Sequence, residues 1–92
     1  MRNESIETID KLLEETNKAH HQAYLATDGY HPDWPIWYAD YLLDKLPPLL
    51  EANLTKSDLI YLLMRLDKKQ ALEAPNSRWS RFYARYLVEK YL

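Results

Sequence analysis

Apolar side chains recur every three or four residues along most of this 92-residue chain. That spacing places them on one face of a helix, so the pattern predicts helices rather than strands. Polar and proline-containing segments interrupt the pattern and divide it into four helices, expected near residues 5–27, 33–46, 55–73 and 77–91. Residues 49–54 are mostly apolar but short, and the pattern leaves open whether they form a turn of helix or a packed loop.

Residues of the right type stand at the expected helix ends. Small polar side chains that can accept a hydrogen bond from the first turn precede each start, and the predicted N-caps are Ser5, Asp33, Thr55 or Ser57, and Ser77. Gly29 can end the first helix in a left-handed conformation. Pro47-Pro48 should end the second helix at Leu46, because the residue before a proline is pushed out of helical geometry and proline has no backbone donor.

The second and fourth helices share one sequence pattern. Residues 34–45 read Trp-x-x-Trp-Tyr-Ala-x-Tyr-Leu-Leu-Asp-Lys, and residues 79–90 read Trp-x-x-Phe-Tyr-Ala-x-Tyr-Leu-Val-Glu-Lys. Segments that repeat in this way should share their local structure and bury the same face. We therefore expect an all-α fold in which residues 1–92 form a single helical domain. Its four helices form two related helix hairpins, residues 1–46 and 47–92, with the internal repeat at 33–46 and 78–91.

Charge is distributed unevenly between these halves. The net charge is −2, but residues 1–46 carry four Lys or Arg and nine Asp or Glu, whereas residues 47–92 carry eight and five. An acidic hairpin should therefore dock on a basic one. Asp40 and Arg85 occupy equivalent positions of the repeat and should face each other if the two aromatic helices lie side by side. Without a dense basic stripe, the chain is not expected to bind nucleic acid.

Composition narrows the class of protein further. Eight Tyr, three Trp and one Phe supply large side chains, which should form an aromatic centre. The chain has no cysteine, which excludes a disulfide framework and thiolate chemistry. No apolar run approaches the ~20 residues of a membrane span, and residues 1–15 contain no signal-like apolar segment. We therefore expect a cytoplasmic protein without a membrane partner.

The aromatic motif carries a resemblance to a known group of proteins. The chain combines the pair His20-His21 with Asp33-Trp34-Pro35-x-Trp37-Tyr38-Ala39. In this it resembles small uncharacterised bacterial proteins with a His-His pair and a Trp-Pro-x-Trp-Tyr-Ala core, and Trp79-x-x-Phe82-Tyr83-Ala84 is similar to their second half. The resemblance implies a helical fold, and it carries no activity, cofactor or site residue with it.

A partly polar pocket between the aromatic helices is one candidate binding site. It could hold a flat or cationic ligand, and the residues expected to surround it are His20, Tyr24, Trp37, Tyr38 and Tyr83. An aromatic stripe at helical spacing is also typical of an ordinary hydrophobic core, so a ligand pocket and a packed core both stay open as interpretations. Adjacent histidines point about 100° apart on a helix and cannot both face one ion, so we expect no metal site and no cofactor.

The favoured function is a non-catalytic protein-interaction module. Catalysis is disfavoured, because no Ser or Cys stands beside a base and no pair of carboxylates has surroundings that would shift its pKa values. We therefore predict no catalytic residue. The chain has more large apolar residues off the main stripes than a small bundle can bury, and those expected to form an interaction surface are Tyr61, Val88, Tyr91 and Leu92. The simplest partner is a second copy, forming a homodimer. The alternative function is a small-molecule or metal-binding domain that uses the aromatic pocket.

Overall fold

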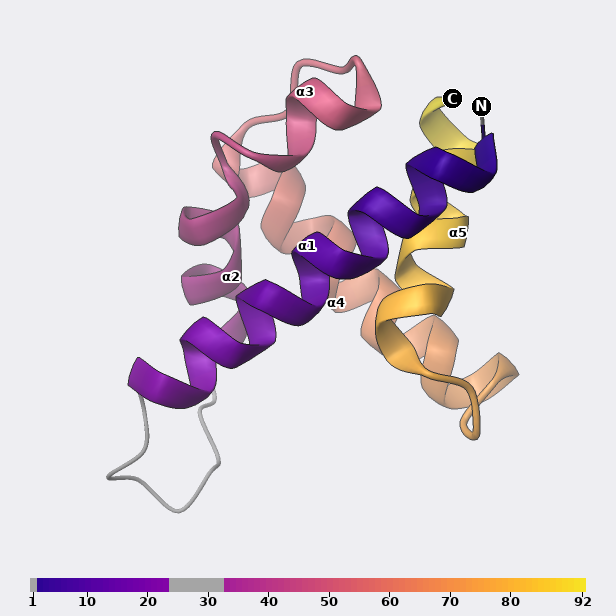
Figure 1. Cartoon of the computed structure of the whole chain (residues 1–92). Coiled ribbons are helices and arrows are strands. Elements are labelled where there is room, and N and C mark those ends of the chain that lie inside the picture. The colour runs from indigo at the N-terminus through magenta and orange to yellow at the C-terminus, as the bar shows by residue number, and fades with distance from the viewer. Residues whose placement is uncertain (1, 24–32) are drawn as a thin grey trace.

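The computed structural model describes residues 2–23 and 33–92. These residues form five helices: α1 (Arg2–Ala23), α2 (Trp34–Leu42), α3 (Leu46–Leu50), α4 (Lys56–Glu73) and α5 (Trp79–Tyr91). Figure 1 shows α1 crossing the front of the molecule and α4 crossing behind it, with α2 and α3 on one side and α5 on the other. The all-α class is confirmed. In the described part of the chain, however, the short helix α3 adds a fifth helix to the four predicted.

The proline pair begins a helix instead of ending one. α2 ends at Leu42, and α3 starts at Leu46 with Pro47 and Pro48 in its first turn. The first donors of a helix have no partner within it, so a proline loses nothing there. The predicted end of the second helix at Leu46 was therefore wrong. α3 ends at Leu50, and its C-cap residue Glu51 adopts a left-handed conformation with φ of 52°.

The four predicted N-caps have different outcomes. Thr55 caps α4 with a complete capping box: its hydroxyl accepts from the Asp58 N–H (3.1 Å), and the Asp58 carboxylate accepts from the Thr55 N–H (2.9 Å). Asp33 stands at the N-cap of α2 but forms no side-chain cap bond. The prediction of Ser77 as the N-cap of α5 was wrong, because its hydroxyl donates to the Ala74 carbonyl (2.7 Å) and Arg78 takes the cap position. The prediction of Ser5 as the N-cap of α1 was also wrong, since α1 already begins at Arg2.

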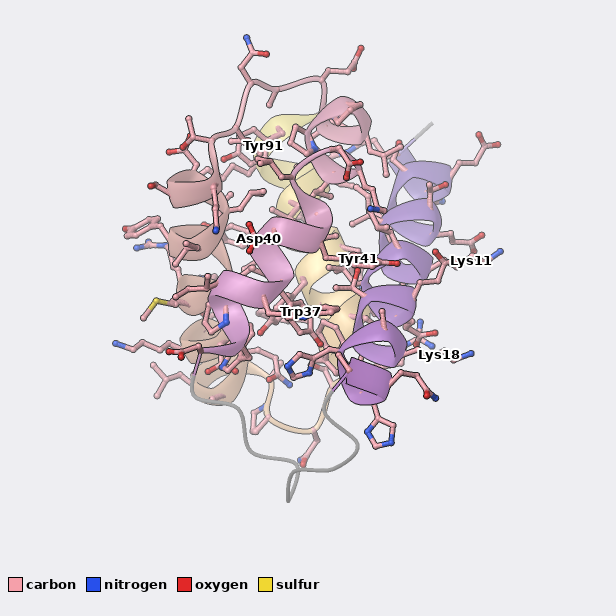
Figure 2. All side chains as sticks on the ribbon, turned by 90° about the vertical axis from the view of Figure 1, so that its left-hand side faces the viewer. Lys11, Lys18, Trp37, Asp40, Tyr41 and Tyr91 are labelled. Atoms are coloured by element: carbon pink, nitrogen blue, oxygen red, sulfur yellow. The ribbon has the colours of Figure 1, made fainter. Side chains whose placement is uncertain are left out.

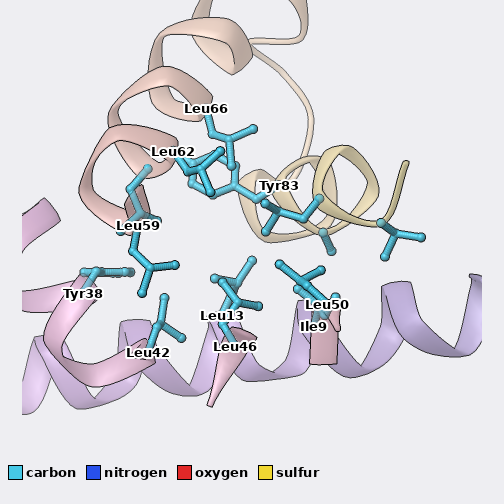
Figure 3. Close-up of a cluster of buried hydrophobic side chains, with 14 of the residues drawn as sticks. Ile9, Leu13, Tyr38, Leu42, Leu46, Leu50, Leu59, Leu62, Leu66 and Tyr83 are labelled. Atoms are coloured by element: carbon cyan, nitrogen blue, oxygen red, sulfur yellow. The ribbon is translucent and has the colours of Figure 1, made fainter. Parts of the chain in front are cut away.

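The centre of the molecule is aliphatic rather than aromatic (Figure 3). All five helices contribute to it, and its fully buried large apolar residues are Ile9, Leu13, Leu42, Leu46, Leu50, Leu59, Leu66 and Val88. Tyr38 and Tyr83 are the aromatic residues that join this core, whereas the described tryptophans are only partly buried. Burial of these side chains supplies most of the driving force for folding, at about 1.5 to 3 kcal/mol for each large aliphatic residue.

The most extensive helix contacts run between the first and second halves of the chain. α1 packs mainly on α5, and α2 packs mainly on α4, while the contacts of α1 with α2 and of α4 with α5 are smaller. The expected pairing of Asp40 with Arg85 was wrong for this reason: Asp40 pairs with Lys56 at the start of α4 (2.7 Å). None of the described helices is both long and apolar enough to cross a membrane.

Candidate functional site

Tyr38 is the hub of a group of ring side chains that we call the aromatic cluster. The cluster draws on α1, α2 and α5, and its members are His20, Trp34, Trp37, Tyr38, Tyr41, Trp79 and Tyr83. The centroid of the Tyr38 ring lies 5.3 Å from that of His20, 5.5 Å from Trp34, 5.9 Å from Trp37 and 6.4 Å from Trp79. Most of these pairs are edge-to-face or tilted, which is the favourable geometry for aromatic rings.

The structure brings together most of the predicted pocket residues. The His20 ring meets the Trp37 ring edge-on, with 5.1 Å between their centroids, and it also contacts the Tyr38 ring. Tyr83 joins the group indirectly, through Trp79, whose ring centroid lies 5.2 Å away. Tyr24 lies outside the described residues. Figure 2 shows Trp37 and Tyr41 together between α2 and α1, where their rings stack at 5.5 Å.

Two buried phenols give the aromatic cluster its polar character. The Tyr38 hydroxyl donates to Asn17 Oδ1 (3.1 Å), and burial raises the pKa of Tyr38 to about 12. Burial also raises the pKa of Tyr83, with smaller contributions from Asp67 and Tyr38. Both phenols are therefore neutral around pH 7 and can act as hydrogen-bond donors, but they are poor bases. Among the described residues, no group of three His, Cys, Asp or Glu side chains is placed to hold a metal ion.

A second candidate is a hollow of about 240 Å³ between the start of α4 and the end of α5, which we call the α4–α5 groove. Its lining residues are Leu54, Asp58, Tyr61, Leu62, Lys90 and Tyr91. The groove therefore unites two residues of the predicted interaction surface, because the 62% exposed Tyr61 and the partly buried Tyr91 both line it. Figure 2 shows Tyr91 near the end of α5, and the next residue, Leu92, is 41% exposed.

Val88 does not belong to this surface, so that part of the prediction was wrong. Its side chain is fully buried. The reason is that α5 packs on α1, α3 and α4 together, which covers a wide face of the helix. Leu43, the equivalent residue of the repeat, lies just beyond the shorter α2 and is 41% exposed.

An ionic cluster between α1 and α5 is the feature that sequence reasoning missed. Asp10 is almost completely buried; its Oδ2 accepts from Arg78 and lies 3.8 Å from Arg81 Nη1. Glu14 pairs with Arg78 (3.3 Å) and accepts from the Ser80 hydroxyl (3.4 Å). Opposite charges on the two halves of the sequence were a signal for such contacts. They did not indicate which residues would meet, because the neighbours of α1 were unknown.

Comparisons with known proteins do not add to this geometry. No protein-family model, curated protein or solved structure matches the chain significantly. The resemblance to small bacterial helical proteins therefore stays a prediction from the motifs.

Proposed function

We propose that this protein is a non-catalytic helical module that binds protein, and that it associates with a second copy of itself through the α4–α5 groove. The exposed ring of Tyr61 beside this groove carries the proposal. Tyrosine is among the residues that dominate binding energy at protein interfaces, because its large ring loses little conformational entropy. Tyr91 and Leu92 extend the apolar surface at the same end of α5.

The charges of the groove fit a second copy. Asp58 lines it from the α4 side and Lys90 lines it from the α5 side. A two-fold dimer brings the same patch of both copies together. Each contact between a residue of one copy and a residue of the other copy therefore occurs twice. Such a contact can place the Asp58 carboxylate of each copy opposite the Lys90 ammonium of the other. One acid and one base on a single patch make the patch complementary to itself.

Substitution of Tyr61 tests this function. Tyr61→Glu should weaken self-association by about tenfold or more, because the loss of an aromatic hot-spot residue costs about 2 kcal/mol or more of binding energy. The helices should persist, since the side chain is 62% exposed. Sedimentation equilibrium over a wide range of protein concentration measures the dimer dissociation constant, and circular dichroism checks the helix content.

Leu72 provides the matched control. It lies on the same helix and is 85% exposed, but it does not line the groove. Leu72→Glu introduces the same charge and should leave the dissociation constant unchanged. A molar mass that is the same for the wild type, Tyr61→Glu and Leu72→Glu at every concentration would contradict self-association through the groove.

Ligand binding at the aromatic cluster is the second candidate function. His20, Trp34 and Trp37 are partly exposed, so these rings can be reached from solvent. Electron-rich ring faces attract cations such as quaternary ammonium groups. Titration with choline should then change the tryptophan fluorescence in a saturable way, and His20→Ala should abolish the change. A signal that rises linearly with choline, or that survives in His20→Ala, counts against this candidate.

We also propose that the two hairpins are related structural halves. Exchange of the halves converts the contact of α1 with α5 into that of α4 with α2, and these are the two most extensive contacts of the molecule. The same exchange relates the two smaller contacts, α1 with α2 and α4 with α5. The sequence repeat, 45 residues apart, supports the same correspondence.

A further inference from the structure

The forces that hold this fold together act mainly between its halves. Besides the dominant helix contacts, the ion pairs that join distant parts of the described chain all cross from residues 2–50 to residues 56–92. They are Asp10 with Arg78 and Arg81, Glu14 with Arg78, and Asp40 with Lys56. The Tyr38 and Trp79 rings also meet across the halves. The hairpin α4–α5 therefore finds its complement in the first half and has only small contacts within itself.

The junction between the halves is short and conformationally strained. Residues 51–55 link α3 to α4. Among them Glu51 has φ of 52°, in the left-handed region that a side chain with a Cβ atom disfavours. The turn is held locally, since the N–H groups of Glu51 and Ala52 donate to the carbonyls of Pro48 and Pro47. Short hinges under strain favour exchange of structural elements between chains, because the strain is released when the hinge opens.

We propose that two copies of this chain exchange their α4–α5 hairpins about a hinge at residues 51–55, so that each copy completes the fold of the other. The partner fits because it presents the surface that the chain already uses: the same aliphatic core, the same ion pairs and the same helix contacts. In the exchanged dimer the aromatic cluster is shared, with Tyr38 of one copy against Trp79 of the second copy. The cost of association is reduced, since the only segment that must change conformation is the hinge.

This exchange does not depend on the α4–α5 groove. Apart from Leu54 in the hinge, the residues that line the groove belong to α4 and α5, which travel together when the hinge opens, so most of the groove persists in an exchanged dimer. The two modes of association therefore use different surfaces. They can be distinguished by asking which chain supplies the contacts of the core.

The ion pair of Asp40 and Lys56 offers a direct test. Its two charged atoms are 2.7 Å apart, and both side chains are partly exposed, so a zero-length carbodiimide reagent can join them as an amide. Full-length protein labelled with ¹⁴N and with ¹⁵N is mixed in equal amounts, unfolded, and refolded together at high concentration. After cross-linking and digestion, mass spectrometry shows whether the linked Asp40 and Lys56 peptides carry the same isotope or different ones.

Exchange predicts peptides of mixed isotope. Their share should rise with protein concentration and approach about half, because random pairing makes half of the dimers heterogeneous. A dimer formed through the groove alone keeps Asp40 and Lys56 within one chain and yields only same-isotope peptides. Same-isotope peptides at every concentration would therefore overturn the exchange, whatever the molar mass. In Tyr61→Glu the mixed peptides should persist.

Variants at Glu51 test the hinge. Glycine enters the left-handed region without steric cost, so Glu51→Gly stabilises the closed turn and should lower the mixed share about fivefold. Glu51→Ala is the matched control, since it removes the charge but keeps the Cβ atom, and it should behave like the wild type. Equal mixed shares in all three proteins would contradict the role given to this residue.

Discussion

Tyr38 shows what a single side chain does in this molecule. Its ring contacts the described tryptophans and His20, and its hydroxyl reaches Asn17 on α1. The ring is at the same time part of the aliphatic core, next to the leucines of α2 and α4. One residue therefore ties α1, α2 and α5 together at the end of the molecule where the aromatic cluster lies.

The buried phenols predict how stability depends on alkaline pH. In the folded protein the pKa of Tyr38 is raised to about 12 and that of Tyr83 is also raised, whereas both return to about 10.0 on unfolding. Above pH 10 the unfolded chain loses protons that the folded chain keeps, so the free energy of unfolding should fall as pH rises. Urea unfolding at several values between about pH 9 and 11 measures this slope.

Tyr38→Phe separates the two phenols. This variant keeps the ring and removes one group with a raised pKa, so its free energy of unfolding should fall less steeply above pH 10 than that of the wild type. At neutral pH it should cost about 0.5 to 1.5 kcal/mol for the lost hydrogen bond to Asn17. Tyr61→Phe, at an exposed position, serves as the control. An alkaline slope that Tyr38→Phe leaves unchanged would show that Tyr38 does not carry the effect.

Among the elements, α4 has the best-defined start. The capping box at Thr55 satisfies donors of the first turn, and the Thr55 backbone N–H holds the pKa of the Asp58 carboxyl below its ordinary value of 3.8. The folded state thus favours the carboxylate, and this contribution to stability is present above pH 3.8 and lost as pH falls below it.

Removal of the cap should destabilise the protein measurably. Thr55→Ala should lower the free energy of unfolding by about 0.5 to 2 kcal/mol, because the Asp58 N–H loses its acceptor. Ser57→Ala, two residues further on and also exposed, is the matched control and should change it by less than about 0.5 kcal/mol. Chemical denaturation measures both. Equal losses in the two variants would mean that the hydroxyl of Thr55 does not act as a cap.

Much of the helical architecture was predictable from periodicity and end signals. The long helices α1, α4 and α5 follow from their apolar spacing, and Thr55 is one of the two N-caps that the sequence offered for α4, the other being Ser57. Pro47 and Pro48 misled the prediction because a proline pair is compatible with both a helix end and a first turn. Only the packing of Leu46 and Leu50 into the core decides between the two.

The arrangement of the whole molecule was harder to predict. Periodicity identifies the apolar face of a helix but not the helix that covers it, so the sequence did not indicate that α5 would pack on α1, α3 and α4. For the same reason Val88 was predicted to be exposed, and Asp40 was predicted to face Arg85. Of the aromatic cluster, His20, Trp37 and Tyr38 had been proposed from the sequence as lining residues of one pocket, and the structure places their rings in contact.

The ionic cluster gives a prediction for the union of the two halves. Arg78→Met removes the main partner of the buried Asp10 carboxylate, whose Oδ1 has no hydrogen bond among the described residues. We expect a loss of about 1 to 3 kcal/mol in the free energy of unfolding, toward the lower end because Arg78 itself is 57% exposed. Adding Asp10→Asn should restore part of it, since an amide is less costly to bury than an unpaired charge.

Arg85→Met is the control for this experiment. Arg85 is exposed on α5, the helix that Arg78 caps, so its substitution should change the free energy of unfolding by less than about 0.5 kcal/mol. Thermal or urea unfolding compares the variants. Equal losses for Arg78→Met and Arg85→Met would show that the contacts with Asp10 add nothing specific to the docking of the halves.

The position of the tryptophans has a consequence for spectroscopy. The chain has three, and all of them contact the ring of Tyr38. Tryptophan fluorescence therefore reports on one end of the molecule, where excitation energy can pass from tyrosine to tryptophan over a few ångströms. Loosening of the opposite end, around Leu54 and Tyr91, would leave the emission spectrum almost unchanged. Melting curves followed by tryptophan fluorescence thus record the loosening of α1, α2 and α5 around Tyr38.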